Sequence, residues 1–170
     1  LFYAPVLVWL GGALVKILDT GMRVLPQREW LEREMLLYRE LYETTVRAEG
    51  DAVLVLPFLT GETLAALLED ASISDFERVR AIELAVAALV DFHRRGFTHG
   101  DAMAENVMVD LDAGAARWFD FETVHDLDLS LILRRADDVR ALLATCVLRV
   151  APDRVAGTVA LILDRYGDRD

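Results

Sequence analysis

Apolar residues along the first third of the chain recur with two different periods. Residues 6–10 and 14–18 are mostly apolar and flank Gly11 and Gly12, a pattern typical of a β-hairpin closed by a tight turn. The stretch QREWLEREMLLYRELYETT follows Pro26, and its apolar residues recur at helical spacing. Because proline favours the first turn of a helix, the sequence predicts a long helix that begins there.

The middle of the chain predicts one strand and two helices. Residues 52–59, AVLVLPFL, lie between two turn-forming segments and predict a buried strand. A short helix is expected over residues 62–70. Ser74 and Glu77 form the signature of a capping box, which predicts the start of a second, longer helix that ends near Gly96.

The last third begins with a loop and a hairpin. Residues 97–106 read as a loop, followed by two strands at 107–110 and 116–121. From about Arg134 the apolar spacing predicts two more helices. Strands and one helix come first and mostly helices follow, so the sequence predicts an α+β fold whose two lobes join near residues 57–61.

Composition and charge narrow the classes of function. The 170 residues are 54% hydrophobic and 28% charged, which predicts a sizeable core. A net charge of −11 disfavours a nucleic-acid partner, because affinity for the phosphate backbone needs clustered Lys and Arg. Cys146 is the only cysteine, which fits a reducing, cytoplasmic setting. The apolar start, residues 1–15, is shorter than the roughly 20 residues of a spanning helix, so no transmembrane segment is expected.

Two short polar motifs stand at a spacing that suits phosphoryl transfer. His99-Gly100-Asp101 precedes Asn106 by five residues, and Asp120 follows the second strand of the predicted hairpin. Phosphoryl transfer needs metal ions on the phosphates, a positioned cation and an acceptor for the hydroxyl proton. Asp101 would accept that proton, while Asn106 and Asp120 would hold the metal.

A lysine and a glutamate upstream complete this set. Lys16 lies in an otherwise apolar predicted strand, where an unpaired charge is costly, so we expect it to bind the α and β phosphates. Glu34, in the following helix, would hold that lysine through an ion pair. Glu32 in the same helix is the alternative partner.

The motifs resemble those of the protein-kinase superfamily. HGDAMAEN resembles the catalytic loop H-R-D-x-x-x-x-N, and DFE resembles the metal-binding D-F-G. Gly in the first motif and Glu in the second are similar to small atypical and small-molecule kinases. These include RIO-type, tRNA-modification-associated and lipopolysaccharide-core kinases, aminoglycoside phosphotransferases and choline kinases.

This resemblance implies a bilobal fold and further site residues. It implies a small β-rich N-lobe at residues 1–59 and a truncated helical C-lobe at residues 60–170. LVLPFLTGETL resembles the hinge of the superfamily, which implies that backbone groups of Pro57 and Leu59 meet adenine. The stretch ADDV resembles the acidic helix start that braces the catalytic loop, which implies a structural role for Asp138.

The sequence departs from the family pattern at both ends. No G-x-G-x-x-G loop precedes Lys16, so the phosphate-covering loop is either upstream of Leu1 or missing. No A-P-E segment lies between Glu122 and Asp138, and about thirty residues follow Asp138. Such a short C-lobe resembles the minimal atypical kinases, which often act with a protein partner. Glu122 is a further candidate for a metal or substrate contact.

The three histidines show no zinc-ligand spacing. His99 would pack behind Asp101 in the loop, while His93 and His125 are expected to be helix-end and surface polar residues.

The expected activity is an ATP- and Mg²⁺-dependent transfer of the γ-phosphate to a hydroxyl of a protein, sugar or glycolipid. Two alternatives stay open: a pseudokinase that binds nucleotide within a protein complex, and an ATPase in which water replaces the acceptor. A pseudokinase would bind nucleotide without transferring phosphate. An ATPase would release phosphate without forming a phosphorylated product.

Overall fold

The computed structural model describes residues 21–44, 46–50 and 53–167. The predicted hairpin at residues 6–10 and 14–18, together with Lys16, lies outside the described residues.

The described residues form an α+β fold with five α-helices and three small antiparallel sheets. Strands β4, β5 and β6 form the largest sheet, β1 pairs with β7, and β2 pairs with β3. The elements are β1 (Met22–Val24), α2 (Gln27–Tyr42), β2 (Arg47–Glu49), β3 (Val53–Val55), β4 (Glu62–Thr63), α3 (Leu64–Glu69), α4 (Asp75–Arg94), the 3₁₀ turn η1 (Ala104–Asn106), β5 (Val107–Asp110), β6 (Ala115–Trp118), β7 (Thr123–His125), α5 (Leu131–Val147), the 3₁₀ turn η2 (Pro152–Arg154) and α6 (Val155–Gly167).

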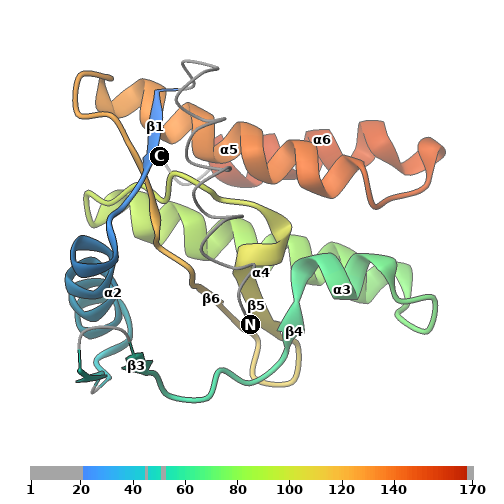
Figure 1. The fold of residues 1–170 in the computed structure, drawn as a ribbon. Helices are drawn as coiled ribbons and strands as arrows, with labels where there is room; N and C mark the ends of the chain where they lie inside the picture. The colour runs from blue at the N-terminus through green and yellow to red at the C-terminus, as the bar shows by residue number, and fades with distance from the viewer. Residues whose placement is uncertain (1–20, 45, 51–52, 168–170) are drawn as a thin grey trace, which may run out of the picture.

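Helix α4 is the centre of the fold. It contacts α6 and α3 as well as strands β5 and β6, and in Figure 1 it lies between the α5–α6 pair and the β5–β6 hairpin. The buried side chains Ala81, Ala85 and Leu89 recur at helical spacing and form the face that packs into the core. The predicted capping box is confirmed: Ser74 accepts a hydrogen bond from the Glu77 N–H, and the Glu77 carboxylate accepts one from the Ser74 N–H.

One continuous core joins α2 to the second half of the chain. Leu37 and Tyr38 of α2 are buried in the same cluster as Phe92 of α4, Trp118 of β6 and Phe121. The Tyr42 hydroxyl donates a 2.6 Å hydrogen bond to the Trp118 carbonyl. Helix α2 therefore packs directly on the hairpin that carries the Asp120 motif.

The predicted buried strand at 52–59 is wrong in extent and in burial. Strand β3 spans Val53–Val55, and the side chains of Val53 and Val55 are 50% and 39% exposed. Within the described residues β3 pairs only with β2, so the two-stranded ribbon has no described neighbour to cover it. Residues after Val55 run as an irregular segment to β4.

Other element boundaries shift by a few residues. The helix that follows Pro26 ends at Tyr42, because Glu43 adopts a left-handed conformation with φ of 49°. The second hairpin strand ends at Trp118, two residues before Asp120. Helix α5 begins at Leu131, where the Ser130 side chain caps it. The pairing of β1 with β7 was not predicted.

Candidate active site

The loop between α4 and β5 carries the HGD motif and is fixed by its backbone. Gly100 has φ of +88°, a conformation that favours glycine. A Cβ atom built on Gly100 would lie 2.7 Å from the Thr123 carbonyl oxygen of β7. The close packing of the loop on β7, together with the positive φ, therefore favours glycine at this position.

Asp138 of α5 also holds this loop. Its Oδ2 atom accepts a hydrogen bond from the His99 N–H at 2.8 Å, and Oδ1 accepts one from the Gly100 N–H at 2.9 Å. Oδ2 also accepts from His93 Nε2 at 2.9 Å. The carboxylate is buried and has three donors, so the predicted bracing contact of Asp138 with the loop is confirmed.

His99 is a buried, neutral spacer behind the loop. Burial lowers its pKa to about 4, and this effect outweighs the nearby Asp138 carboxylate, which raises the pKa. Its Nδ1 accepts a hydrogen bond from the Asp101 N–H at 3.3 Å, and Nε2 then donates to the Phe119 carbonyl at 3.1 Å. The ring thus links the Asp101 backbone to the chain just before Asp120.

Asp101 and Asn106 are in direct contact. The Asn106 Nδ2 atom donates to the Asp101 carboxylate at 3.0 Å and to the Asp101 carbonyl at 2.9 Å. Asn106 ends the 3₁₀ turn η1 and is buried, whereas Asp101 is half-buried. This pair of bonds fixes the carboxylate and leaves the Asn106 Oδ1 as the amide atom that can coordinate a metal.

Asp120 adopts an unusual backbone conformation. Its φ of 66° lies in the left-handed region, which aspartate and asparagine tolerate better than most residues. Its side chain is exposed, yet desolvation by the surrounding protein still raises its pKa. Phe121 follows, is fully buried, and stacks on Phe92 with ring centroids 5.6 Å apart.

Glu34 reaches this turn from α2. Its side chain is buried, and its Oε2 accepts a hydrogen bond from the Phe121 N–H at 3.0 Å. Burial, the largest cause, raises the pKa of Glu34 to about 7, and Asp120 adds to the effect. Glu32, the alternative from the sequence, lies on the surface and pairs with Arg28. The pairing of either residue with Lys16 stays a prediction.

The site carries an excess of negative charge. Burial, mainly, raises the pKa of Asp101 to about 6, and the Asp120 and Glu105 carboxylates raise it further, while the Asn106 hydrogen bond lowers it. The pKa of Glu122 is also raised by desolvation, by Asp120 and by Asp101. Like-charged carboxylates that perturb one another in this way are typical of sites that bind cations or move protons.

Few of the described side chains near this loop can serve as ligands for a metal ion. Within the described part of the chain, no three His, Cys, Asp or Glu side chains stand together as a metal site. The set predicted from the sequence, Asn106 and Asp120, would supply two ligands. Mg²⁺ is commonly held by one or two carboxylates together with phosphate oxygens and water, so two protein ligands fit a metal that arrives with nucleotide.

Pro57 and Leu59, the predicted adenine contacts, are both half-buried. They lie on the segment between β3 and β4, and Leu59 packs against the core while Phe58 is 89% exposed. The segment is anchored at its end, because Thr60 Oγ1 donates to Asp110 of β5 at 2.6 Å and Gly61 sits against the Val109 backbone.

The sequence did not identify Arg33 as a loop contact, and it misplaced one histidine, His125. Arg33 of α2 donates to the Thr98 carbonyl at 2.8 Å. His93 is at a helix end as expected but is buried against Asp138. His125 is wrong as a surface residue: it is 3% exposed, with its ring nitrogens near Thr98 and Asp137. Buried hydrogen-bond partners distant in sequence leave no local signal.

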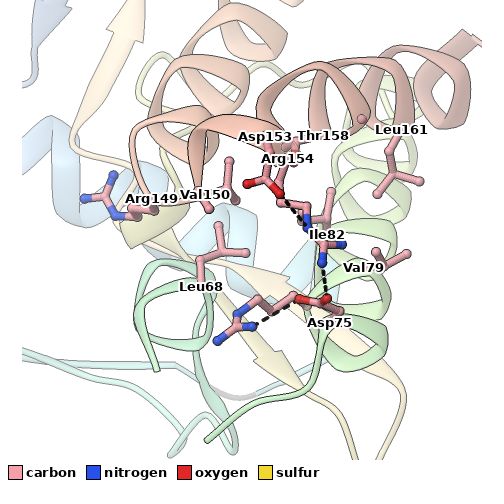
Figure 2. Close-up of a pocket in the computed structure, with 13 residues that line it drawn as sticks. Leu68, Asp75, Val79, Ile82, Arg149, Val150, Asp153, Arg154, Thr158 and Leu161 are labelled. Carbon is pink, nitrogen blue, oxygen red and sulfur yellow. Dashed lines mark hydrogen bonds and ion pairs between the residues drawn. The ribbon is translucent and has the colours of Figure 1, made fainter. Parts of the chain in front are cut away.

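A separate pocket lies away from this loop. It has a volume of about 650 Å³ and lies between α3, α4, η2 and α6, with the apolar side chains of Leu68, Ile82 and Leu161 in its walls (Figure 2). Its arginines are engaged in ion pairs, including Arg154 and Arg78 with Asp75. None of the sequence-predicted site residues lines it.

Comparisons with known proteins add no relationship. No family model and no curated protein matches the chain. No helix among the described residues is long and apolar enough to cross a membrane.

Proposed function

We propose that this chain is an ATP- and Mg²⁺-dependent phosphotransferase of the kinase-like, two-lobed kind. The observation that carries the proposal is the hydrogen bond between Asn106 and the Asp101 carboxylate, with the charge of Asp120 near enough to raise the pKa of Asp101. The hydrogen bond joins two residues five apart in the loop, and the electrostatic effect of Asp120, from the turn after β6, supports its inclusion in the same site.

Asp101 is the proposed acceptor of the hydroxyl proton. A pKa of about 6 keeps it ionised at neutral pH while bringing its basicity closer to the working pH than that of an ordinary aspartate. The bonds from Asn106, and the Asp138 contacts behind the loop, hold the carboxylate in place. Positioning of this kind supplies much of the catalysis in phosphoryl transfer.

Asn106 and Asp120 would hold the magnesium ion. The metal would neutralise charge that develops on the phosphate oxygens and orient the phosphates. Crowded carboxylates with raised pKa values favour such a cation, because it offsets their mutual repulsion.

The nucleotide would extend from this metal toward the segment between β3 and β4. Backbone groups of Pro57 and Leu59 would contact adenine, and Lys16 would bind the phosphates with Glu34 as its partner. The burial of Glu34 beside Phe121 supports this choice over Glu32. The γ-phosphate would pass to a hydroxyl of a protein, sugar or glycolipid.

The first experiment is calorimetric titration with ATP, with and without Mg²⁺, on the wild-type chain and on Asp120→Ala. We expect metal-dependent binding by the wild type and at least a hundredfold weaker binding by the variant, since one of two protein ligands is removed. Asp112→Ala, which removes an exposed carboxylate from the β5–β6 turn, is the matched control. Equal binding by wild type and Asp120→Ala would contradict the metal assignment.

A second experiment separates transfer from binding. Asp101→Asn should reduce γ-phosphate transfer by about a hundredfold or more while changing ATP affinity little, because this carboxylate faces the acceptor. Incubation with radiolabelled ATP and candidate acceptors measures transfer, and calorimetry measures affinity. Metal-dependent ATP binding without transfer to any acceptor or to water would identify the pseudokinase alternative instead.

A further inference from the structure

A second pocket, of about 380 Å³, lies beside α2. Thr98, at the start of the loop that carries Asp101 and Asn106, is one of its lining residues. The pocket is formed by α2, β1, β7 and the first turns of α5. Three of its lining residues, Arg23, Arg33 and Arg134, are arginines. The larger pocket of Figure 2 also has three arginines, so the two pockets differ in how their arginines are paired.

Two of these arginines have no carboxylate partner among the described residues. Arg33 donates one hydrogen bond, to the Thr98 carbonyl, and forms no ion pair there. The Arg134 guanidinium makes neither a hydrogen bond nor an ion pair with any described residue, and the Nε atoms of Arg33 and Arg134 are buried without an acceptor. The buried Nε–H groups of these two guanidiniums lose hydration without a hydrogen bond in return.

The acidic groups at the pocket are already engaged. Glu29 pairs with Arg23 at 3.2 Å, and Glu32 pairs with Arg28, whose side chain points into solvent. The two ring nitrogens of His125 contact the Thr98 hydroxyl and the Asp137 carboxylate. By contrast, Arg78, Arg149 and Arg154 of the larger pocket in Figure 2 each lie in ion pairs.

Apolar side chains line the rest of the pocket. Leu25, Leu36, Val124 and Leu127 contribute to the walls, and Leu127 is 83% exposed. An inorganic anion would leave these walls in water, whereas an organic group attached to the anion would cover them. The lining therefore suits a ligand with both an anionic and an apolar part.

We propose that this pocket binds a phosphomonoester, with its phosphoryl group between the Arg33 and Arg134 guanidinium groups. Phosphate oxygens match the planar fork of arginine, and a dianion satisfies two such groups at once, which a carboxylate does less well. The site is distinct from the proposed nucleotide site and needs no metal. It contacts the catalytic loop, because Arg33 holds the Thr98 carbonyl next to His99.

The test uses phenyl phosphate as the probe, titrated into the full chain without nucleotide or Mg²⁺. Benzoate and inorganic phosphate serve as the carboxylate and free-phosphate arms. Binding is followed by calorimetry and by amide chemical shifts, with Arg134→Gln as the variant and Arg39→Gln as the matched control. Arg39 is an exposed arginine of α2 outside the pocket, so its loss changes the net charge equally.

We expect saturable binding of phenyl phosphate, with amide shifts centred on Thr98 and residues 124–134. Arg134→Gln should weaken it by about tenfold or more, since a charge-assisted bond is lost, while Arg39→Gln should change it less than about twofold. Benzoate and inorganic phosphate should each bind more weakly than phenyl phosphate.

Three results would overturn the proposal: no saturation by phenyl phosphate at millimolar concentration, equal weakening by the two variants, or benzoate binding as tightly as phenyl phosphate. Inorganic phosphate binding as tightly as phenyl phosphate would overturn the role of the apolar walls. Because the titration omits ATP and Mg²⁺, failure here is distinguishable from failure of the proposed phosphotransferase.

Discussion

Asp138 and Asp120 are two carboxylates that act on the same loop from opposite environments, one buried and one exposed. Asp138 is buried and accepts three hydrogen bonds, from the His99 and Gly100 backbone and from His93. Asp120 is exposed and adopts a left-handed conformation, and desolvation by the surrounding protein raises its pKa. The first arrangement stabilises the loop, whereas the second holds charge that a bound cation would compensate.

The largest expected effect is the loss of stability when Asp138 is removed. Asp138→Ala leaves three buried donors without an acceptor, so the free energy of unfolding should fall by about 3–5 kcal/mol. Chemical denaturation followed by circular dichroism measures it. Asp91→Ala, which removes a surface ion pair with Arg95, should cost at most about 1 kcal/mol. Similar losses in the two variants would show that the loop does not depend on Asp138.

The packing of Gly100 on β7 gives the next prediction. Gly100→Ala places a Cβ atom against the Thr123 backbone at positive φ, and should cost about 2–4 kcal/mol. Gly96→Ala is the control, because Gly96 has φ of +86° but no atom within 4 Å of a Cβ. It should lose only the conformational part, about 1–2 kcal/mol. Equal losses would mean that the contact with β7 contributes nothing.

Local features of this fold could be predicted from the sequence, whereas contacts between distant segments could not. The capping box at Ser74, the β5–β6 hairpin and the helices follow from local patterns, and the structure confirms them. The pairing of β1 with β7 joins residues about a hundred positions apart, and three-residue strands carry too little periodicity to be recognised. Asp138 was identified only through a family resemblance, since nothing local marks a carboxylate as an acceptor for a distant loop.

Some residues of the candidate site could likewise be predicted from local motifs, and others could not. Asp101, Asn106 and Asp120 stand in compact motifs, and Glu34 was chosen from several glutamates of one helix. The structure brings Asp101 and Asn106 into contact and places Glu34 at the Phe121 backbone. The contact of Arg33 with the loop and the burial of His125 depend on how α2 and β7 pack, so no local sequence pattern predicts them. Strand β3 was misjudged because its apolar residues lie on an exposed ribbon.

Glu34, whose pKa is raised partly by Asp120, predicts that the stability of the protein depends on pH. The pKa of Glu34 is raised from an ordinary 4.5 to about 7, so the folded state binds more protons than the unfolded state between these values. Its contribution to stability is therefore present below pH 4.5 and is lost as the pH rises to about 7. His99, with its pKa lowered to about 4, acts in the opposite direction up to its ordinary value of 6.5.

Glu34→Gln isolates the first of these effects. Glutamine still accepts from the Phe121 N–H but does not titrate, so the variant should gain stability relative to wild type as pH rises from 4.5 to 7. We expect a change of about 2–3 kcal/mol across this range. Denaturation at pH 4.5, 5.5, 6.5 and 7.5 measures it. Glu32→Gln, at the exposed alternative, should show no such trend, and a constant difference for Glu34→Gln would contradict the raised pKa.

The smallest expected change in the free energy of unfolding is for the substitution of Asp120. Asparagine tolerates the left-handed conformation as well as aspartate does and carries no charge, so Asp120→Asn should change the free energy of unfolding by less than about 1 kcal/mol, in the stabilising direction. The same substitution should abolish any rise in melting temperature that Mg²⁺ and ATP together give the wild type. A variant that is destabilised by several kcal/mol would place Asp120 with Asp138 as a structural carboxylate. A variant that keeps the full ligand-induced rise would show that the turn after β6 holds no metal.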